Sequence, residues 1–584
     1  EIGQRLGDAW LGDPGQSHLF VQVQACADRF RAYCIEHTLL DFSLQMALFT
    51  NVLWKLPACR DLLQTRYRHL IYDNVEEDNP AAQDIIRDWL PHFESALVIY
   101  DTEAGYRRFL GSDPDNGYTL RGVCGETVEF DQSFVTSPDV YAFGNELGRA
   151  LGQYAETVPG DSTAAFTYEV RRFYPDMLNR VAEEVRRLVE EEHVPPGEIA
   201  ILSPFLPDAL RFSLMQRLEG IPTRSLRPSR ALSEEPAAHC LLTLAQLAHP
   251  NWEIQPATVD VAYALMQAIG TLEPDQTLDL VRAQLLAQEA YPHAGSKSGL
   301  APFDSLPVET QERVTHILGE RYDALRGWLE EYIARNQNPT PAAPEPGAKP
   351  KARRKSKKKA APEPEVITAL SEPELDNFFS LLFGEVLSQR GFGFFGDAAA
   401  ADTVWNLTDS ARNFRRTFSG KGIISQPLGQ EYVRTLQGGI IANQYLREWQ
   451  QPGQVSPLRV DSVLLAPAYT FLMNNVPVTY QFWLDIGSRS WFERPYQPLT
   501  HPYVLSRQWK PGEKWTDERE YELRRESLYQ LTIGLTRRCR KGVYLAISEL
   551  GENGYESQGE LLQVLNRMLR RFAAAQHEGE TNDV

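Results

Sequence analysis

Acidic side chains cluster where a short apolar segment ends. Residues 69–72 read His-Leu-Ile-Tyr, and Asp73, Glu76 and Glu77 follow within five positions. An Asp at the end of a buried strand can hold Mg²⁺, directly or through water, and a following Glu can polarise the water that attacks a phosphate. The pattern predicts a nucleotide site of the Walker B type. The alternative is a helix N-terminus made of acids, which suits the helix dipole.

A strand, a helix and a second strand are predicted around these acids. The strand candidates are residues 69–73 and 94–101, and residues 81–93 between them have a helical pattern. This order within about 35 residues is typical of a parallel sheet. Residues 1–60 have helical spacing of their apolar positions, so we expect helices before the first strand.

The rest of the chain divides into helical and strand-like segments. We expect one amphipathic helix over residues 166–193 and mostly helices over 235–335 and 370–450. The remaining predictions are strands within 195–205, 459–469, 478–487 and 542–548, and a helix over 522–540. Residues 491–509 are aromatic-rich, which suits either a surface that stacks on bases or a packed irregular loop.

Composition indicates a globular protein. The 584 residues allow roughly three to five domains, and no apolar run approaches the ~20 residues that span a bilayer. The net charge of -19 argues against a basic nucleic-acid-binding exterior, although a groove can still be basic. Six scattered cysteines without CxxC spacing argue against a zinc site and favour a cytoplasmic location. The first residue is Glu1, so we expect a fragment or a processed form.

Residues 336–365 are rich in proline and alanine, with eight Lys or Arg between Lys349 and Lys359. Such a segment cannot bury a core, so we expect a disordered linker. Its basic run suits either a phosphate-binding tether or a solvated linker.

Several segments, in order, resemble the UvrD/Rep/PcrA class of superfamily 1 DNA helicases. Residues 67–79 are similar to that family's motif II and residues 96–113 to its motif III. In the second segment Phe109 stands where the family stacks an aromatic ring on a base; the alternative for Phe109 is an ordinary core aromatic. Further matches in the family's order are residues 39–44, 128–147, 200–226, 233–250 and 524–548.

The resemblance implies an α/β fold with two RecA-like (P-loop NTPase) motor domains, each with a parallel sheet, plus an α-helical insertion domain. The first RecA-like domain is expected to be incomplete. The implied parts are 1–160 (first RecA-like domain), 161–232 (start of the second), 233–335 (insertion), 336–366 (linker), 367–455 (remainder of the insertion) and 456–584 (remainder of the second).

The resemblance also implies ATP and Mg²⁺ as cofactors. Asp73 would hold Mg²⁺, and Arg537 would reach the γ-phosphate from the second motor domain. The implied catalytic residues are Asp73, Glu76, Glu77 and Arg537; the implied ATP-binding residues are Asp101, Gln132, Thr536 and Arg540; the implied DNA-binding residues are Arg108, Phe109 and Arg211.

Departures from the family fall on the nucleotide site. Asn74 stands where the family has its catalytic Glu, and an amide cannot act as a general base. Ala104 replaces a Gln that senses the γ-phosphate, and Val135 replaces a phosphate-binding Arg. No Walker A pattern occurs in the chain; in the family it lies upstream of motif II, in sequence that would precede Glu1. Glu76 or Glu77 could replace the missing base after a small register shift.

Two functions follow from these observations. The first is an ATP-driven translocase or helicase on single-stranded or partly duplex DNA, acting in repair or recombination. The second is an ATPase-inactive, DNA-binding scaffold subunit, by analogy with the inactivated helicase halves of AddB and RecC. Either function implies DNA and possible partner subunits, and neither implies a membrane. A binding module without motor ancestry would make the ordered motifs accidental.

Overall fold

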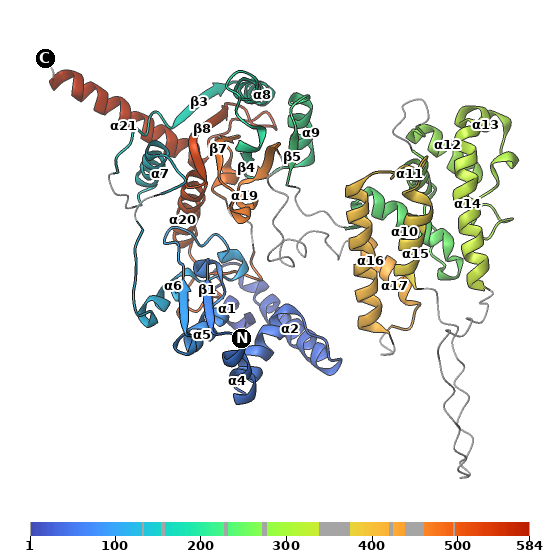
Figure 1. The fold of residues 1–584 in the computed structure, drawn as a ribbon, viewed down its shortest axis with the longest axis horizontal. Coiled ribbons are helices and arrows are strands. Elements are labelled where there is room, and N and C mark those ends of the chain that lie inside the picture. The colour runs from blue at the N-terminus through green and yellow to red at the C-terminus, as the bar shows by residue number, and fades with distance from the viewer. Residues whose placement is uncertain are drawn as a thin grey trace, which may run out of the picture. The chain divides into compact units, whose positions relative to one another are not determined.

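The chain forms an α/β unit and a helical unit (Figure 1). The computed structural model describes residues 2–130, 133–153, 158–226, 232–270, 277–337, 374–419, 424–438, 461–493 and 497–582. The α/β unit comprises Glu1–Pro228 and Gly453–Val584, and the helical unit comprises Ser229–Pro452. Most of the predicted linker, from residue 338 on, lies outside the described residues.

A six-stranded parallel sheet forms the centre of the α/β unit, with the order β3-β8-β7-β4-β6-β5. Its central strand β4 pairs with both β6 and β7, so segments from either side of the helical unit in the sequence build one sheet. The strands are β3 (Phe166–Arg171), β4 (Ile199–Ser203), β5 (Thr223–Ser225), β6 (Val463–Pro467), β7 (Val478–Trp483) and β8 (Cys539–Ser548).

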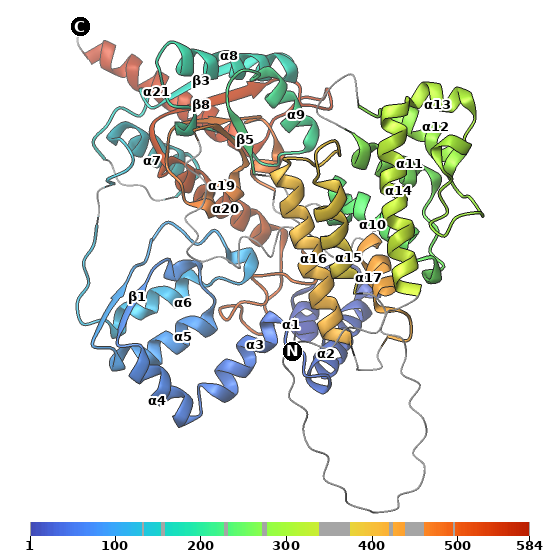
Figure 2. The ribbon, with the colours of Figure 1, turned by 45° about the vertical axis from the view of Figure 1, so that its right-hand side comes forward.

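Helices cover both faces of this sheet, as a parallel sheet requires (Figures 1 and 2). One core contains side chains of α7 (Pro138–Ala150), α19 (Ala468–Asn474), α20 (Asp517–Thr536) and α21 (Glu560–Asn582). The opposite core contains side chains of α8 (Tyr174–Glu190) and α9 (Asp208–Arg217). Strand β4 alternates between them, because Ala200 and Leu202 join the first core and Ile199 and Ile201 the second.

The prediction of a single helix over residues 166–193 is wrong in its first part. Residues Phe166–Arg171 form β3, and only Tyr174–Glu190 are helical. The strand forms because β8 supplies its backbone partner, with Phe166 opposite Val543. Pro175 at the start of α8 was the available signal, since proline is tolerated in the first turn of a helix but breaks its interior.

The predicted strand–helix–strand unit is confirmed. Strand β1 (His69–Tyr72) runs parallel to β2 (Ser95–Val98), with α5 (Pro80–Trp89) between them in sequence. Both strands carry exposed apolar side chains, including Ile71 (76% exposed). The preceding helices are α1 (Ile2–Ala9), α2 (His18–Glu36), α3 (Phe42–Leu48) and α4 (Pro57–Arg66).

In the helical unit the described regular elements are all helices. Helix α10 (Pro236–Ala248) lies at its centre, and almost all of its residues are buried. The other α-helices are α11 (Thr258–Ile269), α12 (Leu280–Ala290), α13 (Val308–Val314), α14 (His316–Gln337), α15 (Leu375–Leu382), α16 (Ala398–Phe418) and α17 (Leu428–Gln437). Across both units, no helix within the described residues is long and apolar enough to cross a bilayer.

Candidate functional site

Asp73 and Asn74 follow β1 directly, and both side chains are exposed. The Asp73 carboxylate accepts a hydrogen bond from the backbone N–H of Asn74 at 2.9 Å. Asn74 has φ +54° and ψ +46°, the left-handed conformation that Asn adopts more readily than most residues. The amide at position 74 therefore suits the sharp turn that leads into residues Val75–Glu77.

Glu76 turns inward and is 1% exposed. Its Oε2 accepts a hydrogen bond from the backbone N–H of Asp101 at 3.1 Å. Because β1 and β2 are parallel, their carboxyl ends meet at one edge, and Glu76 joins the two ends there. Burial raises the pKa of Glu76 to about 7. A buried carboxyl group that is hydrogen-bonded to the backbone stabilises the turn and is not positioned to activate a water molecule.

Glu77 holds the loop after β2. Its Oε1 accepts hydrogen bonds from the backbone N–H groups of Gly105 (3.0 Å) and Tyr106 (2.8 Å), and its Oε2 from that of Arg107 (2.8 Å). Gly105 has φ +105°, a conformation that favours glycine. Three backbone donors occupy both oxygens of Glu77, so the carboxylate orders this loop instead of polarising water.

Arg537 lies at the C-terminus of α20 and contacts the same loop. Its Nη2 donates to Glu103 Oε2 at 2.9 Å, and its guanidinium carbon lies 3.4 Å from the centre of the Tyr141 ring. The Tyr529 hydroxyl donates to Glu103 Oε1 at 3.1 Å. Thr536 is fully buried, and its hydroxyl donates to the Ile533 carbonyl at 2.9 Å. The arginine expected at a phosphate is therefore bound to a carboxylate.

The other predicted site residues have different partners. Arg540 forms an ion pair with Glu198, which also accepts a hydrogen bond from Thr479 at 2.7 Å. Arg108 pairs with Asp115 at 3.1 Å, and Arg211 pairs with Asp208 at 3.4 Å. Gln132 and the side chain of Phe109 lie outside the described part of the structure.

Sequence reasoning missed the partners of Arg537. Tyr529 precedes it on α20 and lies within the segment that resembles the family, so its position offered a signal. Glu103 and Tyr141 also lie in segments that resemble the family, residues 96–113 and 128–147, but nothing in those segments indicates a contact with Arg537, which lies 434 residues from Glu103. Only the packing of the 101–107 loop and α7 against α20 brings these side chains together.

The residues fit Mg²⁺ and ATP only in part. Asp73 offers exposed carboxylate oxygens, which hard cations prefer. Within the described residues, however, no group of three or more His, Cys, Asp or Glu side chains could hold a metal ion. Glu76, Glu77 and Arg537 are each engaged elsewhere. With these contacts in place, neither glutamate is positioned to activate water, and Arg537 is paired with a carboxylate instead of a phosphate.

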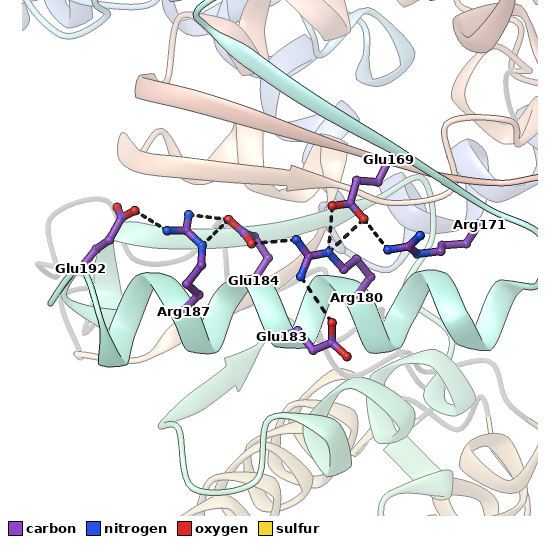
Figure 3. Close-up of polar contacts among 7 residues, drawn as sticks. All are labelled: Glu169, Arg171, Arg180, Glu183, Glu184, Arg187 and Glu192. Atoms are coloured by element: carbon purple, nitrogen blue, oxygen red, sulfur yellow. Dashed lines mark hydrogen bonds and ion pairs between the residues drawn. The ribbon is translucent and has the colours of Figure 1, made fainter.

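A second charged cluster connects α8 to the edge strand β3 (Figure 3). Glu169 on β3 accepts hydrogen bonds from Arg180 at 2.8 and 2.9 Å and from Arg171 at 2.9 Å. Glu184 accepts from Arg187 at 2.6 Å and from Arg180 at 3.3 Å. The charged groups of the cluster are paired with one another. Because Arg180 of α8 binds Glu169 of β3, the cluster stabilises the packing of the helix against the sheet.

Comparison with known proteins does not assign the chain to a family. No protein-family model matches the sequence. No curated protein matches it significantly either. The function is therefore argued from the motifs and from the geometry of the residues after β1, after β2 and at the end of α20.

Proposed function

We propose that the chain is a UvrD/Rep-like helicase homologue that acts as an ATPase-inactive, DNA-binding scaffold. In this proposal the α/β unit derives from two RecA-like domains and holds single-stranded or partly duplex DNA within a repair or recombination complex. Support comes from the motif-like segments in the helicase order and from the parallel sheet with helices on both faces. The binding of DNA and of a partner subunit is part of this proposal and is taken from the resemblance.

The observation that carries this proposal is how the acids after β1 are used. Glu76 is buried against the Asp101 backbone, and Glu77 accepts three backbone hydrogen bonds in the loop after β2. Neither carboxylate is available as the general base that Asn74 cannot be. Loss of the base favours a scaffold over a motor.

A working motor is the second candidate, and one observation favours it. The Asp73 carboxylate is exposed at the strand end, with the backbone of Asn74 as its recorded hydrogen-bond partner. That carboxylate could contact Mg²⁺ of a bound nucleotide. A motor would require Glu76 or Glu77 to leave its backbone partners and Arg537 to leave Glu103.

The test measures DNA binding and ATP turnover on the same preparation. We expect fluorescence anisotropy to detect binding of a labelled single-stranded oligonucleotide. We expect steady-state ATPase activity, with and without DNA, to stay at the level of the Asp73→Ala variant. DNA-stimulated turnover that disappears in Asp73→Ala would refute the scaffold and establish the motor. Absence of DNA binding would contradict both candidates.

A further inference from the structure

We propose that Glu103 is a built-in anion that occupies a polyphosphate-binding site formed by Arg537, Tyr141 and Tyr529. Neutralising this carboxylate would open the site to an external polyphosphate. The choice of polyphosphate rests on the proposed helicase ancestry, whereas the blocked site itself follows from the contacts. The inference goes beyond a missing base, because it identifies what stands where the phosphate would bind.

Two donors from α20 converge on the Glu103 carboxylate. Arg537 Nη2 contacts one oxygen at 2.9 Å, and the Tyr529 hydroxyl contacts the other at 3.1 Å. Burial, followed by the negative charge of Glu103, raises the pKa of Tyr529, so its hydroxyl stays a donor at neutral pH. Two directed donors can bind a phosphate through two oxygens as they bind this carboxylate.

The guanidinium is held in place independently of Glu103. Its carbon lies 3.4 Å from the centre of the Tyr141 ring. The backbone of the same residue is fixed separately, because the Arg537 carbonyl accepts a hydrogen bond from Thr136 Oγ1 at 2.9 Å. Arg537 Nη1 is buried without a hydrogen-bond partner. The contact with the Tyr141 ring and the unused donor Nη1 do not involve Glu103.

The charges at the site predict that removing the charge of Glu103 raises the affinity for an external anion. The Arg537 side chain is 18% exposed and that of Glu103 34%, so the pair is partly shielded from water. A shielded cation that loses its counter-ion is destabilised and attracts another anion. In the native chain the tethered Glu103 carboxylate competes with any external phosphate at a high effective concentration.

The experiment titrates tripolyphosphate into the full chain without Mg²⁺ and measures affinity by isothermal calorimetry. Glu103→Gln keeps the size of the side chain and removes its charge, and we expect it to bind about tenfold or more tightly than the native chain. The double variant Glu103→Gln/Arg537→Gln should lose this gain. Equal affinity of Glu103→Gln and the native chain, or a gain that survives in the double variant, would overturn the proposal.

Glu520→Gln is the matched control. It removes one negative charge from another ion pair of α20, Glu520–Arg524, whose glutamate is 27% exposed. A general effect of net charge would raise the affinity in this variant too, and such a result would also overturn the proposal. Should Glu103→Gln fail to fold by circular dichroism, Glu103→Asp shortens the carboxylate by one methylene and should give a smaller gain.

This result is separable from the test of function. A native chain that fails to bind DNA would refute the scaffold but leave the tripolyphosphate titration unaffected. Conversely, a scaffold that binds DNA without ATP turnover would stand even if Glu103→Gln gained no affinity for polyphosphate.

Discussion

At the scale of single residues, the buried Glu76 makes the stability of the protein depend on pH. Burial raises the pKa of Glu76 from 4.5 to about 7. Between these values the folded chain retains a proton that the unfolded chain has released, so the free energy of unfolding falls as pH rises. We expect Glu76→Gln to remove this fall and to stabilise the protein at pH 8 by about 2–3 kcal/mol. Urea denaturation at pH 5 and pH 8 measures the effect.

Asp73→Asn is the control for this prediction, because Asp73 is the exposed acid of the same turn. It removes one carboxylate from the turn and leaves the buried one in place, so it separates a general effect of charge from the effect of Glu76. A Glu76→Gln variant that loses stability between pH 5 and pH 8 as steeply as the native chain would contradict the assignment of the buried proton to Glu76.

At the scale of elements, the charged cluster of α8 fastens the helix to the sheet. Burial alone would favour the neutral form of Glu184, but the hydrogen bonds and charge of Arg187 lower its pKa. The ionised Glu184 therefore adds to the free energy of unfolding at neutral pH. This contribution is lost as pH falls below the pKa of Glu184 in the unfolded chain and then through its lower pKa in the folded chain. We expect Glu184→Gln to reduce the free energy of unfolding by about 1–2 kcal/mol at pH 7. Urea denaturation at pH 7 and pH 3 tests this.

Glu183 provides a neighbouring control on the same helix. Its side chain is 65% exposed and contacts Arg180 at 3.4 Å, so Glu183→Gln should cost less than about 0.5 kcal/mol. Equal losses in Glu183→Gln and Glu184→Gln would show that burial of the ion pair does not matter. A loss in Glu184→Gln that does not diminish between pH 7 and pH 3 would refute the electrostatic explanation.

At the scale of the whole molecule, the helical unit contains a buried histidine that should make its stability fall in acid. In the helical unit His249 stacks on Trp252 with ring centres 4.1 Å apart, and burial lowers its pKa from 6.5 to about 4. The unfolded chain binds this proton first as pH falls, so stability is lost between pH 6.5 and 4, by about 3 kcal/mol. Thermal unfolding followed by tryptophan fluorescence should show it.

His249→Phe keeps an aromatic ring over Trp252 and removes the titration. We expect this variant to be no more stable than the native chain at pH 7, since it loses the hydrogen bond to the Ala245 carbonyl. Its stability should change less between pH 6.5 and 4. The exposed His293, substituted in the same way, provides the control for loss of an imidazole from the same unit.

The sequence by itself predicted many of the helices and strands, but not β3, because residues 166–171 were expected to be helical. Apolar runs ending in acids or turns predicted β1, β2, β4 and β7. The side chains of β4 and most of those of β7 are buried, as expected in a parallel sheet, whereas β1 and β2 carry exposed apolar side chains. Helical spacing of apolar residues predicted the helices of residues 235–335. Membership of the helicase family and the binding of a nucleotide and of DNA stay predictions, since similarity of motifs does not show what a site binds or does.

Only the tertiary structure decided how the individual side chains are used. Residues 166–171 became a strand because β8 pairs with them from the far end of the chain. Glu77 became a support for the loop after β2, and Arg537 became the partner of Glu103, because folding brought together groups that are distant in sequence. Local periodicity reports which face of an element is buried. It contains no information on which charged group, hundreds of residues away, will satisfy an arginine.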